Sequence, residues 1–330
     1  MKGKLKGLKN IKAKSVDTND RVKTLPFENA HGFPLVVSTD YSDLNIGAWM
    51  ETNRESIDKN LTKFGGILFR GFNVNTVEKF QGFMAFFENE KLEYKLRSSP
   101  RHAVGEKVYV STEYPKEQSI NMHCESSYAP SHPNKIAFCC LIPAEKGGET
   151  PIADTRKVFN EISEATREKF QEKGVKYRRF FSGRSGMSWE EAFQTESKDQ
   201  VEEECQLSGI DYQWINDNEL ILTWTKKAIW EHPNSGEKIW FNHALFFNEN
   251  AAGYEELRAV LETDQLPNNT FYGDGTNISK EEIQELTQAF EKSTIEFQWK
   301  TGDVLLLDNL LMAHGRNPFE GERKIIVSMI

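Results

Sequence analysis

Short, continuous apolar runs recur along the chain. They lie at residues 66–72 (GILFRGF), 135–143 (KIAFCCLIP), 295–299, 303–307 and 324–329. Runs of this length are typical of strands buried on both faces, and none approaches the roughly 18 apolar residues of a membrane span. Strand-like alternation also extends from residue 212 to 248, including an aromatic strand at 239–247.

Between these runs, apolar residues recur with helical spacing. This pattern predicts helices at residues 44–64, from Thr76 onward, at 163–173 and at 279–291. The polar, acidic segment at 188–207 is interpreted as two surface helices. The last helix has the clearest start, because Ser279 and Glu282 complete a capping box.

Strands at both ends of the chain, with helices between them, predict a mainly β fold. We expect a double-stranded β-helix (jelly-roll) core with inserted helices. No Pro/Gly/Ser-rich linker divides the chain. The interpretation is therefore a basic, disordered tail over residues 1–21, then one domain over 22–330 with a helical insertion at about 160–210.

Composition then narrows the function classes. The 330 residues carry a formal net charge of −9, so a nucleic-acid partner is not expected. The first 14 residues hold six lysines but too few apolar residues for a membrane anchor or a secretory signal. The four cysteines lack metal-type spacing, which favours free thiols in a reducing cytoplasm.

Candidate chemistry begins at the H-x-E triplet His123-Cys124-Glu125. On an extended segment, residues i and i+2 face the same way, so the imidazole and the carboxylate can converge on one ion. Seven histidines and 50 acidic residues give about one such triplet by chance. The triplet alone is therefore weak evidence, and an ordinary surface turn explains it equally well.

A late histidine strengthens the hypothesis. His314 lies in the segment DNLLMAHGRNPFEGERK and can supply the third ligand of a two-histidine, one-carboxylate triad, the arrangement of non-haem iron(II) oxygenases. Nine residues later, Arg323 can return toward the pocket after Pro318 and Gly321. Its planar fork suits the distal carboxylate of 2-oxoglutarate better than neighbouring Lys324 would.

Three blocks together, HCE, KIAFCCLIPAEKGGETPIADTR and DNLLMAHGRNPFEGERK, resemble the TauD/TfdA-type dioxygenases, the clavaminate-synthase-like group. The resemblance runs from about Gly66 to the C-terminus. It implies iron(II), 2-oxoglutarate as cosubstrate and O₂, with substrate oxidation coupled to decarboxylation of 2-oxoglutarate. It further implies that Thr150 assists Arg323 in holding the 2-oxoglutarate carboxylate. Arg70, in the R-G-F block, is interpreted as structural.

The central block most resembles the branch that includes the syringomycin-biosynthesis hydroxylase. That branch implies an amino acid or an amino-acid-derived natural-product intermediate as the small-molecule substrate, free or presented by a carrier protein. Some relatives bind an anionic substrate with a second arginine four residues after the first. Here Val327 or Ser328 stands in its place, which argues against a sulfonate such as taurine. Glu125 argues for hydroxylation rather than halogenation, since related halogenases have a small residue at that position.

Residues beside the metal triplet are the candidates for the substrate pocket: Asn121, Ser126, Ser127 and Tyr128. His243, in WFNHALFFN, is interpreted as a hydrogen-bonded histidine of the core or pocket rather than a ligand.

Other functions stay open at this point. A cupin-type metal-dependent hydrolase or isomerase would use the same three ligands without 2-oxoglutarate. A catalytically silent binding protein could share the barrel. Desaturation or epoxidation could replace hydroxylation on the same oxygenase chemistry. The sequence assigns no oligomeric state.

Overall fold

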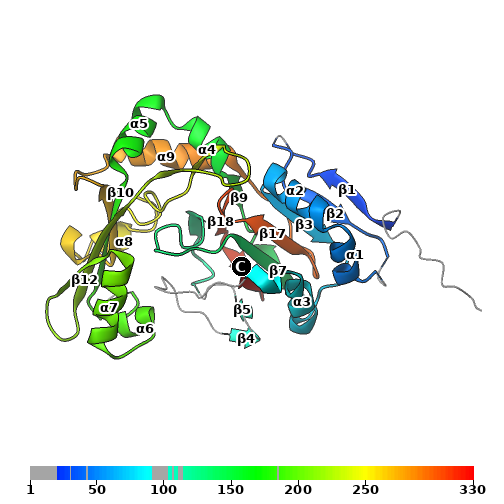
Figure 1. Ribbon diagram of the computed structural model, residues 1–330, viewed down its shortest axis with the longest axis horizontal. Coiled ribbons are helices and arrows are strands. Elements are labelled where there is room, and N and C mark those ends of the chain that lie inside the picture. Colours follow the sequence, from blue (N-terminus) through cyan, green and yellow to red (C-terminus); the bar gives the residue numbers. More distant parts are fainter. Residues whose placement is uncertain are drawn as a thin grey trace, which may run out of the picture.

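The computed structural model describes residues 21–29, 31–41, 44–90, 103–105, 108–110, 114–183 and 186–330. The predicted N-terminal tail lies almost entirely outside these residues. Strands dominate the centre of the molecule and helices cover its flanks (Figure 1). The predicted class, mainly β with inserted helices, is confirmed.

The largest sheet of the described residues has eight strands. β2 and β3 are parallel, and the other neighbours pair antiparallel. Its order is β1 (Lys23–Pro26), β2 (Leu35–Ser38), β3 (Gly66–Arg70), β17 (Val304–Asp308), β7 (Lys135–Ile142), β20 (Lys324–Met329), β5 (Val108–Val110) and β4 (Ala103–Gly105).

A smaller sheet forms the other wall of the barrel. It contains β16 (Thr294–Ile295), β9 (Ile152–Asp154), β18 (Met312–Arg316) and β6 (Ile120–His123), in that order. Two short two-stranded sheets complete the β structure around this core: β8 (Lys146–Gly147) with β19 (Phe319–Glu320), and the hairpin of β13 (Ile229–Glu231) with β14 (Lys238–Trp240). Strands from the middle and the end of the chain thus lie side by side.

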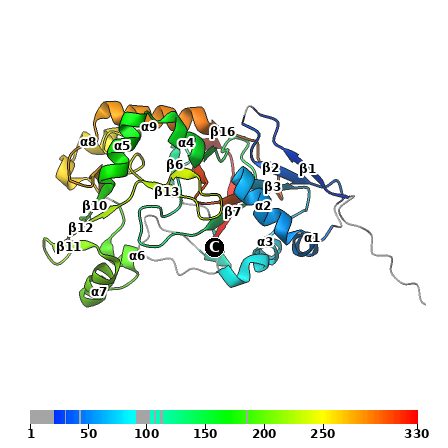
Figure 2. The same ribbon diagram turned by 45° about the horizontal axis from the view of Figure 1, so that its top comes forward.

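A separate sheet lies at one end of the molecule, opposite the N-terminal part (Figures 1 and 2). Its strands are β11 (Asp211–Trp214), β12 (Leu220–Lys226), β10 (Val175–Phe181) and β15 (Asn268–Tyr272). The insertion predicted as helical at about 160–210 therefore also holds a strand, β10. Its alternating burial, with Val175, Tyr177, Arg179 and Phe181 inward, is the pattern of a strand packed on one face.

The helices flank these sheets, and α4, α5 and α9 share one edge of the molecule (Figures 1 and 2). No helix in the described part of the chain is both long and apolar enough to cross a membrane. The helices are α1 (Ile46–Thr52), α2 (Arg54–Phe64), α3 (Val77–Met84), α4 (Thr155–Glu161), α5 (Glu164–Lys173), α6 (Trp189–Phe193), α7 (Lys198–Ser208), α8 (Glu255–Arg258) and α9 (Lys280–Ser293), with 3₁₀ turns η2 (Ala85–Glu90) and η3 (Thr263–Gln265).

The central strand β7 divides its side chains between two hydrophobic cores. Ala137 and Cys139 pack with the cluster under α1, α2 and α3. Ile136, Phe138 and Cys140 belong to the larger cluster on the other face of the sheet. Successive side chains of a strand point to opposite faces, so one continuous apolar run serves both cores. All four cysteines of the chain are free and buried.

Three predicted elements differ in the structure. The strand expected at residues 295–299 ends at Ile295. The helix expected over residues 44–64 breaks at Asn53, whose Nδ2 donates to the carbonyl oxygen of Trp49 at 2.9 Å and competes with the helical backbone. The strand expected at 239–247 ends at Trp240, and a turn follows. Asn242 stabilises that turn because its Oδ1 accepts from the Ala244 N–H while its Nδ2 donates to the Ala228 carbonyl.

Arg70 joins β3 to the end of the loop before β17. Its guanidinium donates to both carboxylate oxygens of Asp303, with a shortest distance of 2.6 Å, and to the Gln298 carbonyl. Asp303 is only 1 % exposed. Arg70 therefore has the structural role expected from the sequence.

Replacing Asp303 with asparagine should lower the free energy of unfolding by about 3 kcal/mol, because the Arg70 guanidinium would lose its counter-charge in a largely buried site. The exposed pair Lys23–Asp40 offers a matched control. Asp40→Asn should leave stability nearly unchanged. Urea denaturation measures both; equal losses in the two variants would contradict a special role for the buried pair.

Candidate metal and cosubstrate site

Two histidines meet across a strand pair of the smaller sheet. His123 ends β6, and His314 lies in β18 directly opposite it in the antiparallel register. Their ring centroids are 4.5 Å apart. Glu125 follows two residues after His123, and one ligand atom from each of the three side chains lies within 4.8 Å of the others. Among the described residues, this is the group whose donors fit a metal ion.

The tautomer of His123 suits metal binding. Its Nδ1 lies 2.8 Å from the carbonyl oxygen of Asn121, which can only accept a hydrogen bond. Nδ1 therefore carries the proton, and Nε2 keeps the lone pair that can face an ion. A backbone carbonyl in this position is the usual partner that orients a metal-binding imidazole.

Glu125 lies beyond the end of β6, in a turn. Ser126 has φ of 55°, so the chain leaves the extended conformation directly after the glutamate. Asn309, in the connection between β17 and β18, binds the backbone of Glu125. Its Oδ1 accepts from the Glu125 N–H at 2.7 Å and its Nδ2 donates to the Glu125 carbonyl at 2.9 Å.

One pocket contains the three candidate ligands together with Thr150 and Arg323. It encloses about 400 Å³ of space, open solvent at its mouth included. Ile136 and Phe138 of β7 contribute apolar walls, so the pocket lies between the two sheets of the barrel. The Phe138 ring contacts the His314 ring at 5.0 Å between centroids.

Arg323 is fixed at the pocket wall by the GGET segment. Its Nε donates to the Gly148 carbonyl at 2.8 Å, and one terminal nitrogen lies 3.4 Å from Thr150 Oγ1. Gly148 has φ of 72°, and a Cβ there would lie 2.9 Å from Cδ of Arg323. Burial, then the nearby Arg316, lower the pKa of Arg323 to about 10, which leaves it cationic at neutral pH.

Thr150 receives a second donor that the sequence did not suggest. The Trp299 Nε1–H donates to Thr150 Oγ1 at 3.1 Å. Because this oxygen already accepts from Trp299 and Arg323, its own hydrogen is directed elsewhere and can be donated to an anion in the pocket.

Arg316 is another cation of the pocket wall. It is buried, and its terminal nitrogens donate to the carbonyls of Tyr114, Pro115 and Gln118. Burial lowers the pKa of Arg316. Its hydrogen bonds fix the segment that leads into β6.

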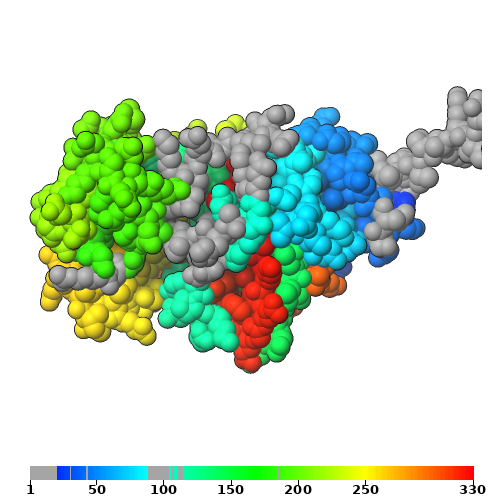
Figure 3. Space-filling model, turned by 90° about the horizontal axis from the view of Figure 1, so that it is seen from below, coloured from blue at the N-terminus to red at the C-terminus, as the bar shows by residue number. Residues whose placement is uncertain are grey.

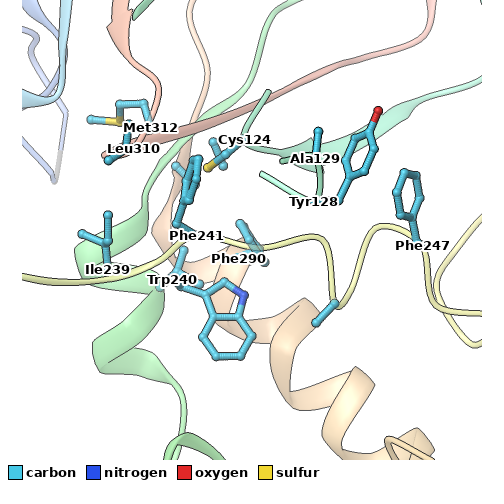
Figure 4. Packing of buried hydrophobic residues seen from close by; sticks show 14 of the residues in the cluster. Cys124, Tyr128, Ala129, Ile239, Trp240, Phe241, Phe247, Phe290, Leu310 and Met312 are labelled. Atoms are coloured by element: carbon cyan, nitrogen blue, oxygen red, sulfur yellow. The ribbon is translucent and has the colours of Figure 1, made fainter. Parts of the chain in front are cut away.

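The four candidate substrate residues are not among the lining residues of this pocket. The Asn121 side chain donates to the Ala252 carbonyl at 2.8 Å. Ser126 Oγ lies 3.4 Å from a carboxylate oxygen of Glu125. Ser127 and Tyr128 are buried. Figure 4 shows Tyr128 within the apolar cluster that also holds Cys124, beside Phe247.

His243 has the role expected for a core histidine. Its Nδ1 lies 2.6 Å from Ser127 Oγ, and its backbone N–H donates to the Tyr177 hydroxyl at 3.0 Å. Burial holds the pKa of His243 well below its usual range. The neutral ring therefore contributes hydrogen bonds and packing rather than charge.

Sequence reasoning missed Asn309, Trp299, Arg316 and Phe138. The asparagine and Arg316 lie inside the DNLLMAHGR segment, so closeness to His314 was an available signal. Trp299 and Phe138 carried no such signal, because their distance from Thr150 and His314 depends on the packing of remote strands.

A jelly-roll barrel with two histidines and one carboxylate on adjoining segments defines the class of non-haem iron oxygenases. The family model described as "Taurine catabolism dioxygenase TauD, TfdA family" matches residues 29–329. The chain belongs to this TauD/TfdA family. It is an iron(II)- and 2-oxoglutarate-dependent oxygenase, an enzyme that consumes O₂. The cupin-type hydrolase and the silent binding protein are thereby set aside.

Two curated relatives cover most of the chain. The dapdiamide synthesis protein DdaC of Enterobacter agglomerans is 38 % identical over 298 residues, 89 % of this chain and 90 % of the relative. A clavaminate synthase-like protein of Arabidopsis thaliana is 28 % identical over 315 residues, 90 % of this chain and 93 % of the relative.

Solved structures share the fold at low identity. PvcB of Pseudomonas aeruginosa has a TM-score of 0.56 and 15 % identity, covering 97 % of this chain and 95 % of PvcB. A further PvcB structure is described as an Fe, alpha-ketoglutarate dependent oxygenase from an isonitrile synthetic pathway, with a TM-score of 0.54, 14 % identity, and coverage of 94 % and 92 % of the two chains.

The segment that follows Glu125 should respond to acid through His132. Burial against Trp230 and Phe241, and then Lys226, lower the pKa of His132 to about 4. An unfolded histidine titrates near about 6.5. The contribution of neutral His132 to the free energy of unfolding is therefore fully present above pH ~6.5, and it is lost as the pH falls toward ~4.

His132→Phe should reduce the loss of stability over that pH window, because the unfolded chain would no longer gain this proton. Urea unfolding of wild type and variant at a series of pH values measures the difference. Parallel curves for the two proteins would contradict the assignment.

Proposed function

We propose that His123, Glu125 and His314 hold the iron(II), and that Arg323 with Thr150 holds the distal carboxylate of 2-oxoglutarate. The observation that carries this proposal is the single pocket containing both groups of side chains. Two imidazoles and one carboxylate are a donor set that iron(II) accepts, and they leave coordination positions open for the cosubstrate.

The bound iron and 2-oxoglutarate supply oxidative decarboxylation to succinate and CO₂, coupled to transfer of one oxygen atom to the substrate. The protein contributes orientation. Arg323 presents its planar fork to a carboxylate from a position fixed by Gly148. Thr150 donates its hydroxyl hydrogen to the same carboxylate, since Trp299 already donates to its oxygen. Ile136 and Phe138 exclude water from this side of the pocket.

We further propose that the substrate is an amino acid or an amino-acid-derived natural-product intermediate, free or presented by a carrier protein, and that the reaction is hydroxylation. The chain is similar in sequence to a dapdiamide synthesis protein and similar in fold to an oxygenase from an isonitrile synthetic pathway. Both similarities support a biosynthetic role. Val327, an apolar residue of the pocket wall, stands where a sulfonate-binding arginine would be expected.

The four free, buried thiols support a cytoplasmic location.

Anaerobic titration of iron(II) in the presence of 2-oxoglutarate should give a visible charge-transfer band. Glu125→Ala should weaken or abolish this band, because the variant loses the anionic ligand of the triad. Glu164→Ala, at the exposed start of α5, is the matched control and should keep the band. A wild-type protein without the band would refute the proposed site.

Thr150→Val should raise the dissociation constant of 2-oxoglutarate about tenfold, since it removes one hydrogen bond to a charged group. Arg323→Lys should raise it further, because lysine cannot form the bidentate contact. Metal affinity in the absence of 2-oxoglutarate should stay the same in both variants. Thr52→Val, in α1, is the control. Unchanged 2-oxoglutarate affinity in Arg323→Lys would exclude Arg323 as the carboxylate partner.

Substrate assignment is tested by measuring succinate release across a panel of free and carrier-bound amino acids, together with product mass. A product heavier by one oxygen atom indicates hydroxylation or epoxidation, and one lighter by two hydrogen atoms indicates desaturation. Succinate release that no amino-acid compound stimulates would contradict the proposed substrate class.

A further inference from the structure

The position of Glu125 is not determined by the sheet that positions the two histidines. His123 and His314 face each other in a strand pair, but β6 ends at His123. Residues 125–128 form a turn, and the positive φ of Ser126 turns the chain away from the ladder. Another part of the protein must therefore define where the carboxylate of Glu125 stands relative to the imidazoles.

Asn309 fixes the position of Glu125. It is completely buried, and its side-chain amide pairs with the Glu125 backbone N–H and carbonyl, as the backbone of a neighbouring strand would. Oδ1 accepts from the Glu125 N–H at 2.7 Å, and Nδ2 donates to the Glu125 carbonyl at 2.9 Å and to the Pro133 carbonyl at 2.8 Å. The Asn309 backbone N–H also donates to the Asn134 carbonyl at 2.9 Å. Both ends of the segment that joins β6 to β7 are thereby tied to one residue.

Asn309 is itself rigidly held. The neighbouring Asp308 accepts from the backbone N–H groups of Leu310 and Leu311, and its other oxygen lies 3.0 Å from His232 Nε2. Thr155 Oγ1 donates to the Leu310 carbonyl at 2.8 Å. The same connection continues into β18, which carries His314. One short segment therefore places two of the three candidate ligands.

We propose that Asn309 is the positioning residue for Glu125, and that it governs iron(II) affinity through the backbone of that ligand; this inference rests on the proposed metal site. A primary amide supplies one acceptor and two donors in a single plane, which the Glu125 N–H and the two carbonyls require together. Aspartate keeps the acceptor but loses both donors, and alanine loses all three contacts. Residues that orient metal ligands commonly change metal affinity 10- to 100-fold when replaced.

A second contact on the same turn provides the control. Trp224, in β12, donates its Nε1–H to the Tyr128 carbonyl at 2.8 Å. Trp224→Phe removes a buried side-chain hydrogen bond to the turn but leaves the Glu125 amide contacts intact. General loosening of the turn and specific positioning of Glu125 therefore give different results in the two variants.

The experiment measures metal binding and stability separately. Isothermal calorimetry of the apo full-length protein with anaerobic iron(II), and with Co(II) as a spectroscopic probe, is combined with urea unfolding of the apo form. Asn309→Ala and Asn309→Asp should weaken metal binding at least tenfold, and the Co(II) visible spectrum should shift toward that of Glu125→Ala. Trp224→Phe should lower stability while keeping metal affinity within about twofold of wild type. The aspartate variant, closest in shape, serves if the alanine variant does not fold.

Equal metal affinity in wild type and both Asn309 variants would overturn the inference, as would equal losses in Asn309→Asp and Trp224→Phe. In either case strong metal binding by wild type, weakened in Glu125→Ala, would leave the proposed function intact. Failure of wild type to bind iron(II) would instead refute the proposed metal site and the inference with it.

Discussion

The antiparallel pairing of β6 with β18 is the contact on which the site depends. It joins strands from distant parts of the sequence and places His314 opposite His123. Because side chains of a strand alternate, a shift of one residue in this pairing would turn His314 to the other face of the sheet. β18 also pairs with β9 on its other edge, with His314 opposite Ile152. Thr150 precedes that strand by two residues. One strand thus brings the metal and cosubstrate halves of the pocket into register.

Around this strand the structure combines rigid and irregular elements. The histidines come from ladders, whereas Glu125, Thr150 and Arg323 come from turns or strand ends that side chains hold in place. A turn can bring a side chain into the pocket at a sharper angle than a strand ladder can. The backbone N–H and C=O groups of the turn have no ladder partners, so they need other hydrogen-bond partners. Asn309, Trp224 and Lys226 supply such partners beside Glu125. Figure 3 shows the C-terminal region, in red, at the surface of the molecule. The residues that line the pocket come from two stretches of the chain, 120–150 and 314–327.

The sequence was informative where a short segment determines its own structure. The capping box of Ser279 and Glu282 forms as expected, and the run KIAFCCLIP is the strand β7. The fold class followed from the order of strand and helix patterns, and the cosubstrate chemistry followed from three separated motifs. Residue type was less informative where the partner is remote. The Asn53 break depends on which carbonyl its side chain captures, and nothing in the identity of residue 309 reveals that it binds the backbone of residue 125. Strand-like alternation of apolar residues also cannot distinguish a strand from a turn that an asparagine side chain stabilises, as residues 241–247 show.

The two-faced burial of β7 has a consequence for how this enzyme could diversify. Ala137 and Cys139 belong to one core, while Ile136 and Phe138 line the pocket. Substitutions at positions that share no contact partners combine almost additively. Pocket-facing positions of the strand can therefore drift toward new substrates without disturbing the helices behind it. A strand divided in this way lets the pocket wall change while the core on its other face stays the same.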